Sequence, residues 1–143
     1  MDFEVTDVPG GTYAVIRRMI DPAETPKVMP GLIGQVQAWA ATAPHGVQMC
    51  ISSMTADGKL NIAPGVEVEP GSPFPPEPLE IVIRPAGRAA VYLHVGGYEQ
   101  LPDVYRRFYE AIGEAGLEEA GEPIEIYEKH DPVPETRIIW PVA

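Results

Sequence analysis

Apolar and polar residues alternate in two segments of the chain, residues 3–16 and 79–92. Alternation of this kind predicts half-buried β-strands, and in each segment a proline with a glycine close behind it divides the run into two strands. The second segment begins 76 positions after the first, so that Pro85 falls in the place of Pro9. Because proline presets φ and glycine tolerates positive φ, each segment is predicted to form a strand, a turn and a second strand. The pattern therefore indicates an internal repeat.

In both repeats the period then changes to that of a helix. The second repeat has an apolar stripe at i, i+3, i+4, i+7 and i+11, which consists of Leu101, Val104, Tyr105, Phe108 and Ile112. Charged residues occupy its other face, and Gly116 is expected to end the helix. A weaker stripe in the first repeat consists of Leu32, Val36, Trp39 and Ala40, and residues 44–46 are expected to end it.

Two further strands are predicted after each helix. They are expected at 47–54 and 60–68 in the first repeat, joined by an Asp57-Gly58 turn, and at 123–128 and 136–142 in the second. Between the repeats, residues 70–78 contain five prolines in nine positions. Such a segment is typical of a stiff, extended connector.

A ββαββ plan thus occurs twice, which predicts the fold class. We expect one α+β domain over residues 1–143, with repeat halves at 1–69 and 79–143 and the connector at 70–78. Short connections favour antiparallel pairing, and a single antiparallel sheet with both main helices on one face would bury both apolar stripes. A pseudo-twofold axis between the halves is expected to create a ligand cleft.

Composition narrows the classes of function. The formal charge of −11 repels phosphate backbones, so no direct binding of nucleic acid is expected. No apolar run is long enough to cross a bilayer and the N-terminus lacks the features of a signal peptide, which predicts a cytoplasmic protein that does not contact the membrane. The single cysteine, Cys50, excludes an internal disulfide and is expected to be buried. The histidines are far apart in the sequence, so neither a metal site nor a cofactor is predicted. His94 is expected to fix the turn at Gly96-Gly97 by a hydrogen bond, and His130 to be exposed.

Strand alternation singles out one acidic residue. In residues 124–128, Ile124 and Ile126 point to one side of the strand, and Glu125 and Tyr127 point to the other. If the isoleucines pack beneath the helices, Glu125 and Tyr127 line the opposite surface or the cleft. A carboxylate among aromatic rings is partly desolvated and attracts a delocalised cation. The alternative is an ordinary glutamate that faces solvent.

Several aromatic residues are candidates for the same pocket. Tyr98 and Tyr127 each combine an apolar ring with a hydroxyl, which suits a pocket for planar molecules as well as core packing. The further candidates are Trp39, Tyr105 and Phe108 on the helical stripes and Trp140 on a strand, for which core packing is again the alternative.

The second repeat also contains an ordered series of short motifs. These are His94-Val-Gly-Gly-Tyr98, Gly116-Leu117, Gly121-Glu-Pro123, Glu125-Ile-Tyr127, Asp131-Pro132 and Thr136-Arg-Ile-Ile-Trp-Pro-Val142. As a set, the series resembles the GyrI-like family, which includes the effector-binding domains of AraC-type and MerR-type multidrug-sensing regulators. Two positions depart from the family pattern: Gly97 replaces a usual proline, and Ala111 replaces a tryptophan common in relatives.

The resemblance implies an SHS2-like fold in each half and a ligand-recognising role for Glu125. Three functions follow from it. The first is the binding of hydrophobic or aromatic, often cationic, small molecules for sensing or sequestration. The second is a cyclopropanoid cyclopropyl hydrolase in which Glu125 is the catalytic residue that activates water, and the third is a protein-binding module whose partner is gyrase. The ligand and the oligomeric state, including a homodimer, stay open.

Overall fold

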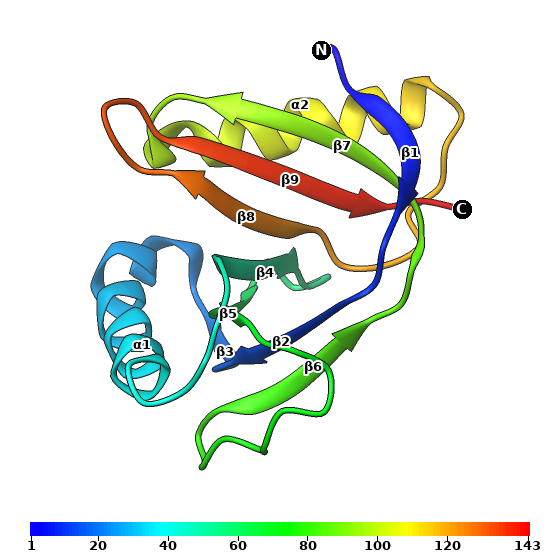
Figure 1. The fold of residues 1–143 in the computed structure, drawn as a ribbon. Helices are drawn as coiled ribbons and strands as arrows, with labels where there is room; N and C mark the ends of the chain where they lie inside the picture. The colour runs from blue at the N-terminus through cyan, green and yellow to red at the C-terminus, as the bar shows by residue number, and fades with distance from the viewer. The chain divides into compact units, whose positions relative to one another are not determined.

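Eleven main elements form in the computed structural model, which describes all 143 residues (Figure 1). They are β1 (Glu4–Val8), β2 (Gly11–Val15), β3 (Arg18–Ile20), α1 (Thr25–Ala40), β4 (Gln48–Met54), β5 (Leu60–Glu67), β6 (Glu80–Arg84), β7 (Gly87–Val95), α2 (Leu101–Glu114), β8 (Ile124–Lys129) and β9 (Glu135–Pro141). Short 3₁₀ helices at Pro22–Glu24 and Tyr98–Gln100 precede α1 and α2. The predicted α+β class is confirmed, and the order of elements in each repeat is ββαββ apart from one additional short strand, β3, before the helix of the first repeat.

The chain divides into two compact units. Unit 1 contains residues 1–9 and 86–143, and unit 2 contains residues 10–85. Within unit 1 the strand order is β1-β7-β9-β8, and within unit 2 it is β4-β5-β2-β6 with β3 also paired to β5. Every one of these pairs is antiparallel, as the short connections predict.

The first strand of each repeat pairs outside its own repeat. Thr6 in β1 lies opposite Ala89 in β7, and Tyr13 in β2 lies opposite Val82 in β6. The two strands that each proline-glycine segment separates are therefore formed as predicted but do not pair with each other. The compact units differ from the sequence halves by the exchange of one strand. Proline and glycine between two strands indicate only that the chain is interrupted there. The partner of each strand is set by long-range packing, which a local pattern does not contain.

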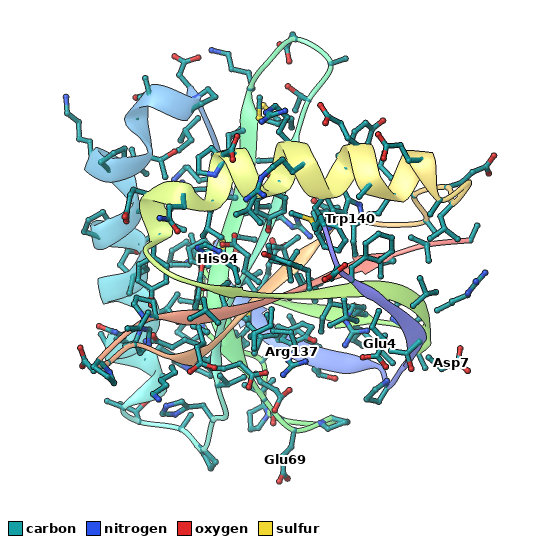
Figure 2. The ribbon with its side chains drawn as sticks, turned by 90° about the horizontal axis from the view of Figure 1, so that it is seen from above. Glu4, Asp7, Glu69, His94, Arg137 and Trp140 are labelled. Atoms are coloured by element: carbon teal, nitrogen blue, oxygen red, sulfur yellow. The ribbon has the colours of Figure 1, made fainter.

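Helix α2 covers unit 1 with the apolar stripe predicted for it. Val104, Phe108 and Ile112 are fully buried and pack against β7 and β9 through Ala90, Ile138 and Trp140. Figure 2 shows Trp140 next to this helix. The helix ends where Gly116 adopts a φ of +74°, a conformation that favours glycine.

Helix α1 begins earlier than its weak stripe predicts. The helix begins with Thr25 and Pro26. Proline is compatible with the first turn, because a backbone N–H at that position would have no partner within the helix. Pro30 lies inside the helix, and Leu32, Val36 and Ala40 form its buried face. Neither α1 nor any other helix has an apolar stretch of the length needed to cross a membrane.

Candidate functional site

One face of the sheet in unit 1 collects polar side chains beneath α2. Thr136 in β9 lies opposite both Tyr127 in β8 and His94 in β7, while Ile138 lies opposite Glu125. Residues directly opposite each other in an antiparallel pair project from the same face. Because Ile138 packs against α2, Glu125 and Tyr127 lie on the helix side of the sheet. One arrangement considered from the sequence has Ile124 and Ile126 packed beneath the helix and Glu125 on the opposite side. The structure has the reverse arrangement, in which Ile124 and Ile126 face away from α2.

Glu125 is a buried acid without a basic partner. Its side chain is only 6% exposed, and hydrogen bonds reach it from Tyr105 on α2 and from Tyr127 on its own strand. Burial raises the pKa of the Glu125 carboxyl to about 7, while the two tyrosine hydrogen bonds lower it in part. No cationic side chain contributes to lowering the pKa of Glu125. At neutral pH this carboxyl is therefore divided between its neutral and charged forms.

Three aromatic rings gather where β8 ends. The Tyr98 and Tyr127 rings meet edge to face with their centroids 5.8 Å apart, and the His130 ring lies 6.2 Å from Tyr98 and 6.4 Å from Tyr127. The Tyr98 hydroxyl is hydrogen-bonded to Nδ1 of His130 at 2.5 Å. Burial, followed by the negative charges of Asp131 and Glu125, raises the pKa of Tyr98. The last of these effects shows that the field of Glu125 reaches this aromatic group.

The remaining predicted site residues divide between the site and the core. Tyr105 contacts both the carboxyl of Glu125 and, at 5.8 Å between ring centroids, Trp140. Phe108 is completely buried against Trp140 at 5.5 Å, and the Trp140 indole N–H donates to Glu119 at 3.1 Å. Phe108 and Trp140 thus form the packed floor behind Tyr105. Trp39 lies on α1 in unit 2, where it is half-buried.

The family of the chain follows from a comparison with known families. The model of the GyrI-like small molecule binding domain matches residues 1–143. The chain belongs to the GyrI-like family. No curated protein sequence matches it.

Several solved structures share the fold of this GyrI-like chain. SAV2435 bound to tetraphenylphosphonium is 12% identical, with a TM-score of 0.70 over 100% of this chain and 94% of that one. The EcmrR C-terminal domain is 18% identical, with a TM-score of 0.70 and coverage of 99% and 97%. A hydrolase from Listeria innocua is 12% identical, with a TM-score of 0.63 and coverage of 99% and 91%. At these identities the likeness concerns the fold.

Two histidines of this GyrI-like domain, His94 and His130, have the environments that the sequence predicts. His94 is buried, and its Nε2 lies 3.0 Å from the carbonyl oxygen of Gly97, which fixes the turn between β7 and α2. Gly96 in that turn has a φ of +145°. His130 is exposed, although its bond to Tyr98 was not foreseen. Cys50 is buried, also as expected.

Thr136 is the polar residue of this face that sequence reasoning missed. Its side chain is completely buried, and its Oγ1 atom has no hydrogen-bond partner. Alternation with Ile138 and Trp140 in the segment 136–142 places all three on one face, and this was the only signal that could have found it.

Unit 2 contains an open surface hollow that we regard as a weaker candidate. Its volume is about 690 Å³, and Thr12, His45, Glu67, Glu69, Ile83 and Arg84 are among the residues that line it. The polar side chains in this lining are exposed or half-buried, so water satisfies them without a ligand. Glu125 and Thr136 are instead desolvated already, which makes the face beneath α2 the better candidate site.

Proposed function

We propose that this GyrI-like domain binds hydrophobic, aromatic cations at Glu125, with Tyr98, Tyr105 and Tyr127 around the bound charge. The observation that carries the proposal is the burial of the Glu125 carboxyl without a cationic side chain beside it. A buried carboxylate is costly unless it is paired, and here the protein supplies only tyrosine hydroxyls. A ligand cation would supply the missing charge.

The tyrosines suit the apolar part of such a ligand. Their rings present π-faces that attract a delocalised cation, and their hydroxyls keep the carboxylate in place. The ring of Tyr98, which is 39% exposed, is the accessible member of the group. Support also comes from SAV2435, a structural neighbour bound to tetraphenylphosphonium, which is a cation of this kind.

Titration calorimetry with tetraphenylphosphonium and with tetraphenylborate tests the proposal. The two ions have nearly the same shape and opposite charges, so a purely hydrophobic site would bind both. We expect binding of the cation alone, and at least a tenfold loss of affinity in Glu125→Gln. Glu128→Gln removes the same charge from an exposed position on the same strand and serves as the matched control. Equal affinity of the wild-type protein and Glu125→Gln for the cation would contradict the proposal.

A second candidate function, hydrolysis of a cyclopropanoid substrate, is favoured by the pKa of Glu125. A general base works best when its pKa is close to the pH of the reaction, and that of Glu125 is about 7. A structural neighbour from Listeria innocua is described as a hydrolase. Incubation with a cyclopropane-bearing alkylator, followed by mass spectrometry, separates the two functions. A mass gain of one water that is lost in Glu125→Gln would support hydrolysis, and binding without a mass change would leave binding alone.

A further inference from the structure

Thr136 has a buried hydroxyl that no group in the protein satisfies. Its side chain is 0% exposed, and Oγ1 has no hydrogen-bond partner. A hydroxyl in this position has given up its hydrogen bonds to water and has gained none in return. Since most buried side-chain polar atoms are paired, the exception requires an explanation.

The position of Thr136 connects it with Glu125. Thr136 lies opposite Tyr127, whose hydroxyl is bonded to the Glu125 carboxyl, and Glu125 lies opposite Ile138, two positions further along β9. Thr136 and Glu125 are therefore diagonal neighbours on the same face, a relation with Cα atoms roughly 7–8 Å apart in a regular sheet. Side chains from two such positions can contact the same small group.

The third polar group in this part of the sheet is His94, directly opposite Thr136 on β7. Its Nε2 lies 3.0 Å from the carbonyl oxygen of Gly97. A carbonyl oxygen only accepts, so Nε2 of His94 is the donor in this contact and His94 is engaged with its own turn. The carboxylate of an ionised Glu125 and the lone pairs of Thr136 Oγ1 thus remain as acceptors on this face.

We propose that Thr136 is a second polar contact of the site and that it favours cations with at least two N–H donors over quaternary cations with none. In a bound secondary ammonium group, one N–H donates to the Glu125 carboxylate and the other to Oγ1 of Thr136. The inference rests on the proposed binding of cations at Glu125. It deepens that function by naming the class of ligand: an aromatic amine that is protonated and keeps its N–H groups.

A matched pair of probes tests this selectivity. N-methyl-(2-naphthyl)methylammonium has two N–H donors, whereas N,N,N-trimethyl-(2-naphthyl)methylammonium has the same ring and charge with no donor. In calorimetry, we expect Thr136→Val to weaken binding of the first probe about tenfold and to change binding of the second less than twofold. Thr136→Ser retains the hydroxyl and is expected to retain the affinity for the first probe. Valine has nearly the shape of threonine, so circular dichroism should show both variants folded.

The outcomes separate this inference from the function on which it rests. If Glu125→Gln weakens both probes but Thr136→Val changes neither, the role of Thr136 is refuted and cation binding stands. Equal losses for both probes in Thr136→Val would also refute it, because a packing defect acts without regard to N–H donors. If the wild-type protein binds neither probe, the proposed function itself fails.

Discussion

At the residue scale, the proposed site contains two polar groups that are buried at a cost to stability. Glu125 has no cationic partner, and Thr136 has no hydrogen-bond partner. Both lie on the face of unit 1 that α2 covers. In such a desolvated place, the electrostatic interactions of any charge that enters are stronger than in water. Groups that weaken a fold and strengthen an interaction are typical of functional sites.

The pKa of Glu125 predicts how cation binding depends on pH. The carboxyl is neutral below a pKa of about 7, so a cation binds there only with loss of the proton. Affinity for tetraphenylphosphonium, which does not titrate, should be constant above this value and fall roughly tenfold for each unit below it. Calorimetry between pH 5 and 8.5, roughly the span in which the linkage predicts the change, measures the dependence. In Glu125→Gln the affinity should be low at every pH, and a pH profile like that of the wild type would contradict the assignment.

The same pKa predicts how stability depends on pH. Between the ordinary value of 4.5 and the folded value of about 7, the folded protein holds a proton on Glu125 that the unfolded chain has released. The free energy of unfolding therefore falls as the pH rises through this window, by about 3 kcal/mol in total. Urea denaturation should find Glu125→Gln more stable than the wild type above the window and equal to it below. A difference that is the same at both ends of the window would refute this linkage.

Removal of the Thr136 hydroxyl should also stabilise the protein. Thr136→Val replaces an unpaired buried hydroxyl by a methyl group of similar size, so the free energy of unfolding is expected to rise by about 1 kcal/mol. Thr136→Ser retains the hydroxyl and removes a buried methyl group, so it should be less stable than the wild type. Urea denaturation of the two variants provides the measurement. A destabilised valine variant would mean that the hydroxyl has a partner.

At the element scale, the packing of α2 supports the proposed site. Phe108 is completely buried, with Phe3, Tyr92 and Trp140 at ring centroid distances of 5.6, 5.9 and 5.5 Å. One turn earlier on the helix, Tyr105 bonds to Glu125. The position of α2 on the sheet therefore determines the position of a hydroxyl in the site.

Truncation of Phe108 tests this support. Phe108→Ala should reduce the free energy of unfolding by about 3–5 kcal/mol, because it leaves a cavity between α2 and the sheet. Its neighbour Tyr109 is 54% exposed, and Tyr109→Ala should cost less than about 1 kcal/mol. Chemical denaturation monitored by Trp fluorescence compares them. Similar losses in both variants would show that α2 does not pack as the structure has it.

Most elements could be predicted from the sequence, because their patterns are local. The stripe from Leu101 to Ile112 predicted α2, and the Asp57-Gly58 pair predicted a turn that Gly58 forms with a φ of +83°. The three-residue strand β3 was missed, since so short a segment has no readable period. For the site, alternation grouped Glu125 with Tyr127, but which face α2 covers depends on long-range packing. That information was not in the local pattern.

At the scale of the whole molecule, each compact unit includes the first strand of the repeat that forms most of the other unit. β1 is the first strand of the first repeat and belongs to unit 1, while β6 is the first strand of the second repeat and belongs to unit 2. Removing either strand from its partner therefore disturbs a unit that consists mainly of the other repeat. A gene fragment that encodes one repeat would lack the edge strand of its unit.

Proline substitutions in β1 distinguish this exchange from a local hairpin. β1 pairs only with β7, so the N–H groups of successive residues in β1 point alternately toward β7 and away from it. Of the neighbours Val5 and Thr6, one therefore donates to β7 and the other does not. Proline has no N–H, so Val5→Pro and Thr6→Pro differ in that only one of them removes a donor to β7. The other substitution is the matched control. The disruptive one should accelerate amide exchange in Gly87–Val95, which lies more than 75 positions away in the sequence, and leave Gly11–Val15 protected. Hydrogen exchange followed by mass spectrometry resolves the two segments. If protection is instead lost in Gly11–Val15, then β1 pairs with its neighbour in sequence and the strand exchange is wrong.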